Sequence, residues 1–190
     1  MFFWLSDRHG ARVQAGWPAE IDVYAGFFNR EAWDRFRLSE VELEQQKERD
    51  EKAEKEEEKD KGDDKDDEEK ADDEDKDEIE LPDPVTIDLE GLEDRMTRLS
   101  VHSADLGAVA VTPDGEKLLY LASFEKGYDL WVSTQRKSEV KLLAKIGADD
   151  VDDLLIDKKG KKAYVLADGG IKSVEIEGGK VKPVALSAKM

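Results

Sequence analysis

Two stretches of this sequence repeat the same order of strands and turns, and this repeat constrains the fold more than any other feature. In the first, "GAVAVTPDG" ends in the turn signal Pro113-Asp114-Gly115, and three strand-like runs follow: "KLLYLAS", "YDLWVSTQ" and "EVKLLAKI". In the second, "DDLLIDKKG" leads to "KKAYVLADGG", "IKSVEIEGG" and "KVKPVAL". The matching turn residues Gly115 and Gly160 lie 45 residues apart. Each stretch is therefore predicted to form a four-stranded antiparallel sheet.

The second strand of each unit is apolar on consecutive residues, from Leu118 to Ala122 and from Ala163 to Ala167. A strand with one face in water would alternate apolar and polar residues, so this pattern indicates cover on both faces. Four-stranded units of about 40 to 50 residues that stack face to face are typical of β-propeller blades. The predicted fold class is all-β: an incomplete β-propeller of four-stranded antiparallel blades.

The opening of the chain is a looser copy of the same unit. "MFFWLSDRHG" corresponds to a second strand, "IDVYAGFFN" to a third, and "PVTIDLEG" to a fourth that follows a charged insertion. The first strand of this unit would lie before Met1, so we expect the chain to begin inside a blade. About two and a half blades cannot close a ring, because propellers usually have about four to eight. We therefore expect a fragment of a larger protein, or an incomplete gene model.

The charged insertion, residues 44–82, separates a partial blade at 1–43 from the completed first blade and two further blades at 83–190. The segment Glu44–Glu80 holds 22 acidic and 9 basic residues, which supply most of the net charge of −18. "SEVE", residues 39–42, is a capping-box pattern, with Leu38 and Leu43 at the positions of a hydrophobic staple. A helix is therefore predicted to begin at Ser39 and to fray into a disordered segment, Asp60–Glu80, that has no apolar period.

The composition also narrows the classes of partner. An acidic chain is a poor match for nucleic acid or an anionic membrane surface, both of which attract clustered Lys and Arg. The sequence has no cysteine, and no apolar run approaches the length of a membrane span. Clustered carboxylates attract hard cations, but the insertion lacks the ligand order of a calcium loop. We expect a solvated insertion, with calcium binding or an interaction tail as alternatives, and we assign no metal ligand and no cofactor.

The segment "PDGEKLLYLASFEKGYDLWV" resembles the propeller repeat of TolB and the tricorn proteases. "FFWLSDRHG", "DVYAGFFN", "AWDRFRLSEVE" and "IDLEGLEDRMTRLSV", in this order around an acidic insertion, resemble more specifically the propeller segment of tricorn-like serine proteases. The resemblance covers nearly all residues outside the insertion. It implies a parent protein in which propeller domains precede a PDZ domain and a serine peptidase domain. It also implies that the propeller guides or gates peptides and supports assembly.

No catalytic residue is predicted, because nothing in the chain matches the catalytic Ser and His of that family. His9 is expected to be a solvated turn residue. His102 has Ser100, Ser103 and Asp105 nearby, but a triad needs a defined geometry that local clustering does not supply. Most aromatic residues are expected in the core, namely Trp4, Trp33, Trp131, Phe27, Phe28 and Phe36. Trp17, in the loop "GWPAE", is the candidate for contact with a partner.

Two functions follow as hypotheses. The first is a non-catalytic propeller fragment of a tricorn-like serine peptidase, whose partners are peptide or protein substrates and the missing blades and catalytic domains of the parent. The second is a TolB-like propeller that acts purely as a protein-binding module. A homo-oligomer remains an alternative assembly. The compartment is left open between bacterial cytoplasm and periplasm or secretion.

Overall fold

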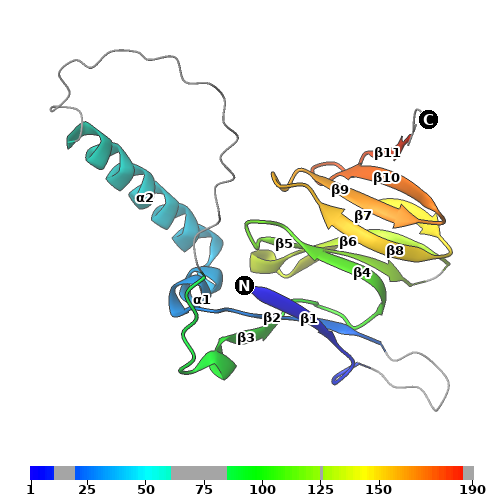
Figure 1. Cartoon of the computed structure of the whole chain (residues 1–190), viewed down its shortest axis with the longest axis horizontal. Helices are drawn as coiled ribbons and strands as arrows, with labels where there is room; N and C mark the ends of the chain where they lie inside the picture. The colour runs from blue at the N-terminus through cyan, green and yellow to red at the C-terminus, as the bar shows by residue number, and fades with distance from the viewer. Residues whose placement is uncertain (11–19, 61–84, 125, 186–190) are drawn as a thin grey trace, which may run out of the picture.

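Three antiparallel sheets stack on one another in the computed structural model, which describes residues 1–10, 20–60, 85–124 and 126–185 (Figure 1). The first sheet consists of β1 (Phe2–Ser6), β2 (Asp22–Gly26) and β3 (Met96–Arg98). The second consists of β4 (Asp105–Val111), β5 (Lys117–Ser123), β6 (Tyr128–Thr134) and β7 (Glu139–Ala148). The third consists of β8 (Val151–Ile156), β9 (Lys162–Ala167), β10 (Gly170–Glu175) and β11 (Val181–Val184).

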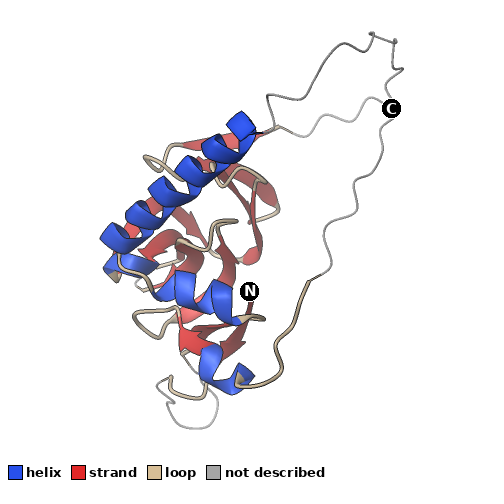
Figure 2. Cartoon of the chain, turned by 90° about the vertical axis from the view of Figure 1, so that its left-hand side faces the viewer, coloured by secondary structure: helices blue, strands red, loops and turns tan. Residues whose placement is uncertain are grey.

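The second and third sheets confirm the two predicted four-stranded units. Their strands follow one another in simple up-and-down order, β4-β5-β6-β7 and β8-β9-β10-β11. Three antiparallel sheets of three or four strands, packed face to face, are consistent with propeller blades, and the described sheets do not close into a ring. The chain is thus mostly β, with two α-helices beside the sheets (Figure 2).

The middle sheet is buried on both faces, as the consecutive apolar residues of β5 predict. Leu118, Tyr120 and Ala122 face the first sheet and join a cluster with Val23 and Ala25 of β2. The alternate residues Leu119 and Leu121 face the third sheet, where they pack with strands β8, β9 and β10. Burial raises the pKa of Tyr120 to about 12. One strand therefore supplies both hydrophobic clusters of the molecule.

The matching turns of the second and third sheets are built alike. Gly115 and Gly160 both have positive φ, 74° and 66°, which favours glycine at these positions. The Thr112 hydroxyl accepts a hydrogen bond from the Lys117 N–H, at 3.0 Å. The carboxylate of Asp157, 45 residues later than Thr112, accepts from the backbone N–H groups at the same place in its own turn. Asp114 also bonds within its turn, as expected for a residue that fixes a hairpin.

The helix α2 (Glu40–Asp60) begins as the capping box predicts. Ser39 and Glu42 bond reciprocally: the Ser39 N–H donates to the Glu42 carboxylate at 2.9 Å, and the Glu42 N–H donates to the Ser39 hydroxyl at 3.4 Å. The Ser39 N–H and the Ser39 hydroxyl, which both donate to this carboxylate, lower the pKa of Glu42. Leu43, the predicted staple residue, is buried. The predicted disorder of Asp60–Glu80 falls almost entirely outside the described residues.

A second helix, α1 (Arg30–Arg37), lies between β2 and α2 and was not predicted. The Asn29 side chain caps it by accepting from the Ala32 N–H at 2.8 Å. Its Trp33 and Phe36 rings contact Phe27 at the end of β2, with centroids 5.3 and 4.7 Å away. The helix therefore covers one end of the cluster between the first two sheets. No helix in the described part of the chain is both long and apolar enough for a membrane span.

The prediction of a fourth strand at 84–91 is wrong for the part that the structure describes, residues 85–91. These residues pair with no strand, and Val85, Ile87 and Leu89 are exposed. Gly91 has φ of 66° and turns the chain into a short 3-10 helix, η2 (Leu92–Arg95). The strand that pairs with the edge of β2 opposite β1 is β3, which follows this helix.

Arg95 explains why the chain takes this path. Its guanidinium is buried and donates to the carbonyl oxygens of Phe27 at 3.2 Å, Phe28 at 3.4 Å and Glu90 at 2.8 Å, and also to that of Asp88. These four carbonyls come from two segments about 60 residues apart in sequence, the end of β2 and the loop before η2. These hydrogen bonds hold residues 88–90 against the end of β2, and β3 begins after them, at Met96.

Candidate protein-interaction site

The first sheet turns one face away from the second sheet, and aromatic rings cover it. We call it the aromatic face: Phe2, Trp4, Tyr24 and Phe28. The register places Trp4 opposite Tyr24 on β1 and β2, and their rings stack with centroids 5.6 Å apart. Phe2 stacks on Trp4 at 5.5 Å and contacts Phe28 at 5.1 Å. The Phe2 ring also lies over Gly26, where an added Cβ would approach it to 2.4 Å, so only glycine fits.

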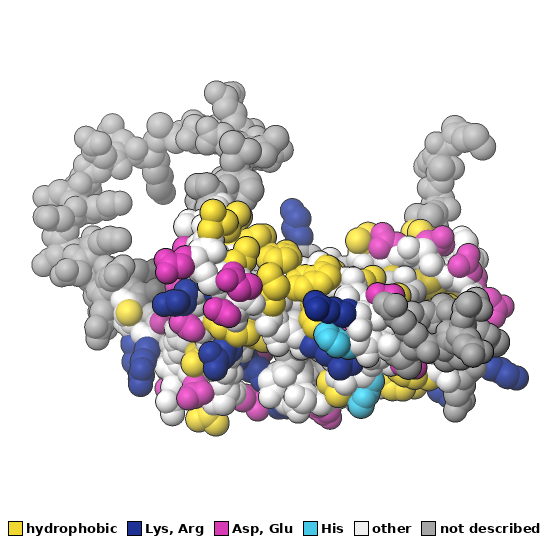
Figure 3. All heavy atoms as spheres, turned by 90° about the horizontal axis from the view of Figure 1, so that it is seen from below, with side chains coloured by type: hydrophobic (Ala, Val, Ile, Leu, Met, Phe, Trp, Pro, Cys, Tyr) yellow, Lys and Arg dark blue, Asp and Glu magenta, His cyan; other side chains and the backbone are white. Residues whose placement is uncertain are grey.

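Basic and polar groups border the aromatic face. His9 Nδ1 lies 2.6 Å from the Tyr24 hydroxyl, in a hydrogen bond whose direction depends on the His tautomer. A hollow of about 330 Å³ opens between the rings and the edge strand, and Trp4, Arg8, His9, Tyr24 and Arg98 are among the residues that line it. Seen from below, hydrophobic side chains gather beside Arg, Lys and His side chains (Figure 3). Stacked rings beside cationic groups suit contact with protein surfaces.

The residues near His102 form a structural cluster around Asp22. The Asp22 side chain is fully buried, and its Oδ1 accepts hydrogen bonds from the Ser100 and Ser103 hydroxyls, both at 3.0 Å. Arg98 makes an ion pair with the same oxygen at 2.6 Å. His102 itself is exposed. Both serine hydroxyls are thus directed at Asp22, and the cluster holds the loop after β3 against β2.

The third sheet also has an uncovered face, opposite the side that packs on the second sheet. The strand register places these side chains on that one face: Leu155, Tyr164, Leu166, Ile171 and Val184. Leu155 is 60% exposed. We call this the Leu155 face. The two outer sheets of the stack therefore each have one face that packs on no other described sheet, whereas the central strand β5 of the middle sheet is buried on both faces.

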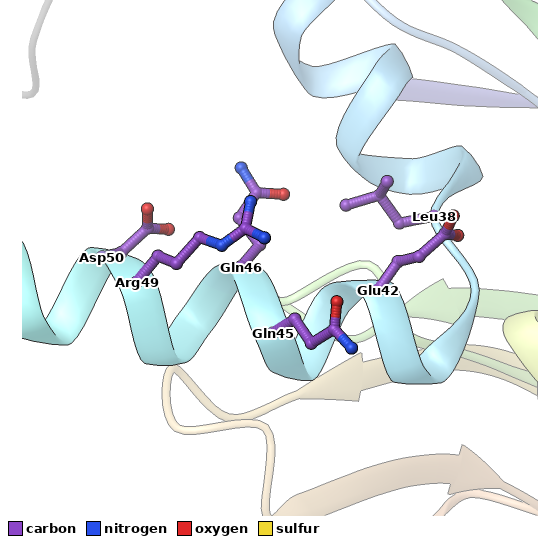
Figure 4. Close-up of a pocket in the computed structure, with 6 residues that line it drawn as sticks. All are labelled: Leu38, Glu42, Gln45, Gln46, Arg49 and Asp50. Atoms are coloured by element: carbon purple, nitrogen blue, oxygen red, sulfur yellow. The ribbon is translucent and has the colours of Figure 1, made fainter.

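A shallow polar hollow lies along α2. Six side chains line it: Leu38, Glu42, Gln45, Gln46, Arg49 and Asp50 (Figure 4). Glu42 is occupied by the capping box, and two of the other groups are neutral amides. The arrangement offers hydrogen bonds without a nucleophile or base. Among the described residues, no group of three or more His, Asp or Glu side chains could hold a metal ion.

The predicted aromatic residues separate into three groups. Phe27, Trp33, Phe36 and Trp131 belong to the core or pack against it, as expected. Trp4 and Phe28 instead lie on the aromatic face, so the expectation that they are core residues is wrong for the described sheets. Trp17, the predicted partner contact, lies outside the described residues and remains a prediction. The alternation of residues along β1 could have shown that Phe2 and Trp4 share a face, but only the register of β1 against β2 places Tyr24 beside them.

Comparison with known proteins gives only distant structural matches. No family model matches the chain, and no curated protein matches it. Among solved structures, the crystal structure of TolB from Acinetobacter baumannii is 19% identical to this chain, with a TM-score of 0.39. The match covers 48% of this chain and 24% of TolB, so the chain spans about a quarter of TolB's length.

Proposed function

We propose that the chain is a non-catalytic β-propeller portion of a tricorn-like serine peptidase, and that it contacts peptide or protein substrates and neighbouring domains through its uncovered sheet faces. The order of motifs around the acidic insertion supports the family, and the stacked four-stranded sheets are compatible with its propeller. In the parent protein such blades would guide or gate peptides toward catalytic domains elsewhere.

The observation that carries this proposal is the contrast between β5 and the Leu155 face. β5 is buried on both faces, whereas Leu155, on the uncovered face of the third sheet, is 60% exposed. Exposed apolar side chains that share one sheet face mark a surface for protein contact. The function expected of such a surface is binding.

A module that acts purely in protein binding, as proposed for a TolB-like propeller, is the second candidate. The blade repeat alone favours it, since that repeat occurs in many propellers. The two candidates differ in what accompanies the chain: a peptidase domain in the same protein supports the first, and further blades without a peptidase domain support the second.

A binding assay with an unfolded protein tests the role that both candidates share. Fluorescein-labelled β-casein is mixed with the full chain, and its anisotropy and its fragmentation are followed together. We expect binding without cleavage, and no labelling of the chain by a fluorophosphonate. Absence of binding would overturn the proposal, and cleavage with fluorophosphonate labelling would overturn its non-catalytic part.

A matched pair of variants locates the binding surface. Leu155→Asp places a charge on the Leu155 face and should weaken casein binding. Val41→Asp places the same charge on α2 at a side chain that is 62% exposed, close to the 60% of Leu155. Equal effects of the two substitutions would show that binding does not involve the Leu155 face.

A further inference from the structure

A broad hollow lies on the second sheet, at the end where β5 and β6 meet their turn. Its volume is about 700 Å³. We call it the Trp131 groove. Its lining comes from β5, β6, β7 and the two turns at this end, and the residues that matter below are Phe124, Lys126, Asp129, Trp131, Leu142 and Lys145.

One wall of the Trp131 groove is apolar and open. Phe124 is 51% exposed, and its ring meets Trp131 edge to face with centroids 4.9 Å apart. Leu142 lies opposite Trp131 in the register of β6 and β7 and is 37% exposed. An aromatic pair beside an exposed aliphatic side chain can receive one apolar side chain of a ligand.

The indole nitrogen of Trp131 is not part of the groove surface. Trp131 Nε1 is buried and has no hydrogen-bond partner in the described structure. Because it is buried, a ligand in the groove contacts the Trp131 ring and not its N–H. Recognition therefore depends on the apolar wall and on the charges of the rim.

The rim of the groove selects the charge of the ligand. Lys126 and Lys145 are exposed on it. The one carboxylate among the lining residues named above, Asp129, is already engaged: its Oδ1 accepts from the Ile146 N–H at 2.8 Å and from the Gly147 N–H at 2.9 Å. Two ammonium groups beside an apolar slot are complementary to carboxylates that flank an apolar side chain.

We propose that the Trp131 groove binds an acidic peptide segment that carries a central apolar or aromatic side chain. The central side chain lies between Phe124 and Leu142, against the Trp131 ring, and flanking carboxylates meet Lys126 and Lys145. This inference rests on the proposed binding function and names the class of peptide and the place where it binds.

The test uses an N-acetylated, fluorescein-labelled peptide of sequence DELFED, with its charge-reversed counterpart KKLFKK as comparison. Anisotropy titration of the full chain should show binding of DELFED and none of KKLFKK. Lys145→Glu should lower the affinity for DELFED at least about tenfold, because it replaces attraction by repulsion at the rim. Phe124→Ala, which removes the exposed ring of the apolar wall, should also lower it.

Lys141→Glu is the matched control, since Lys141 lies on the same strand outside the groove. Equal losses for Lys145→Glu and Lys141→Glu, or equal binding of DELFED and KKLFKK, would overturn the proposal. In a third outcome, DELFED binds only to a variant in which the acidic residues of 63–78 are replaced by neutral ones. That result would assign the groove to this chain's own acidic segment and would likewise overturn the proposal.

The casein assay separates failure of the groove from failure of the proposed function. If casein binds but DELFED does not, the groove inference fails and the binding function stands. If neither probe binds, both fail. Lower DELFED affinity in Lys145→Glu, with casein binding retained through the Leu155 face, supports both.

Discussion

Replacing Arg95 by Ala tests how the chain returns to the first sheet after the insertion. The Arg95 side chain is 3% exposed and donates to four backbone carbonyls, of Phe27, Phe28, Asp88 and Glu90. Without it, the buried Phe27 oxygen and the partly buried oxygens of Asp88 and Glu90 lose this donor, whereas the Phe28 oxygen still accepts from the Asp88 N–H. A buried acceptor left without a partner costs about 1–3 kcal/mol, and a hydrogen bond from a charged group contributes about 1.5–3 kcal/mol.

We therefore expect Arg95→Ala to lower the free energy of unfolding by about 3 kcal/mol, a large share of the stability of a typical domain. Urea denaturation followed by Trp fluorescence measures the loss, provided that the slope of unfolding against urea is unchanged. Arg95→Lys keeps the charge but not the planar donors that reach four carbonyls, so it should recover less than half of the loss.

Arg49→Ala, on the exposed surface of α2, is the matched control and should change stability by less than about 0.5 kcal/mol. A loss in Arg95→Ala no larger than that of Arg49→Ala would refute the reasoning. It would mean that the carbonyls find water or other donors at little cost, and that the guanidinium does not fix the path into β3.

Three further predictions concern packing, helix docking and pH. Leu118→Ala and Leu121→Ala, on opposite faces of β5, should each lower the free energy of unfolding measured in urea by about 2–5 kcal/mol. A small loss for either variant would show that its face of β5 is exposed to solvent. Arg136 donates to the carbonyl oxygens of Arg35 and Phe36 at the end of α1 and pairs with the Glu116 carboxylate. Arg136→Ala should therefore lower the free energy of unfolding by about 2 kcal/mol, whereas Lys137→Ala, at an exposed neighbour, should lower it by less than about 1 kcal/mol. Backbone N–H groups lower the pKa of Asp157, so the ionised carboxylate stabilises the fold at pH 7 and less so as the pH falls. Asp157→Asn should therefore melt at a lower temperature than the unsubstituted chain at pH 7, and this difference should shrink toward about pH 3. A difference that stays constant with pH would contradict this.

The second and third sheets follow directly from the sequence. Apolar runs such as Leu118–Ala122 and turns at Gly115 and Gly160 are local signals, and strand existence and order depend mainly on such signals. The start of α2 was also predictable, because the capping box of Ser39 and Glu42 is contained in four residues.

The first sheet was harder to predict because its pairing depends on long-range contacts. Arg95 donates to carbonyls 68 and 67 residues upstream, and no local pattern reveals that residues 85–91 will be held by these hydrogen bonds instead of pairing as a strand. Helix α1 had a readable signal in the Asn29 cap, but "AWDRFR" has an aromatic pattern that also suits a strand.

The candidate sites were mostly beyond sequence analysis. The aromatic face depends on the register of β1 against β2, and the Trp131 groove depends on a turn and on shifts in the register of β6 and β7. Neither the pairing of Trp4 with Tyr24 nor the buried Trp131 Nε1 is encoded in a motif of fixed spacing.

The central claim is that the stacked sheets enclose a packed interior and leave the Leu155 face free for protein contact. Because the sequence has no cysteine, single cysteines report cleanly on exposure. We would measure thiol labelling of Leu155→Cys and of Val165→Cys, which lie on opposite faces of the third sheet, with and without β-casein. The account predicts that Leu155→Cys reacts freely and becomes protected by casein, while Val165→Cys reacts only on unfolding. Equal labelling of the two sites, or no protection of Leu155→Cys by bound casein, would contradict it.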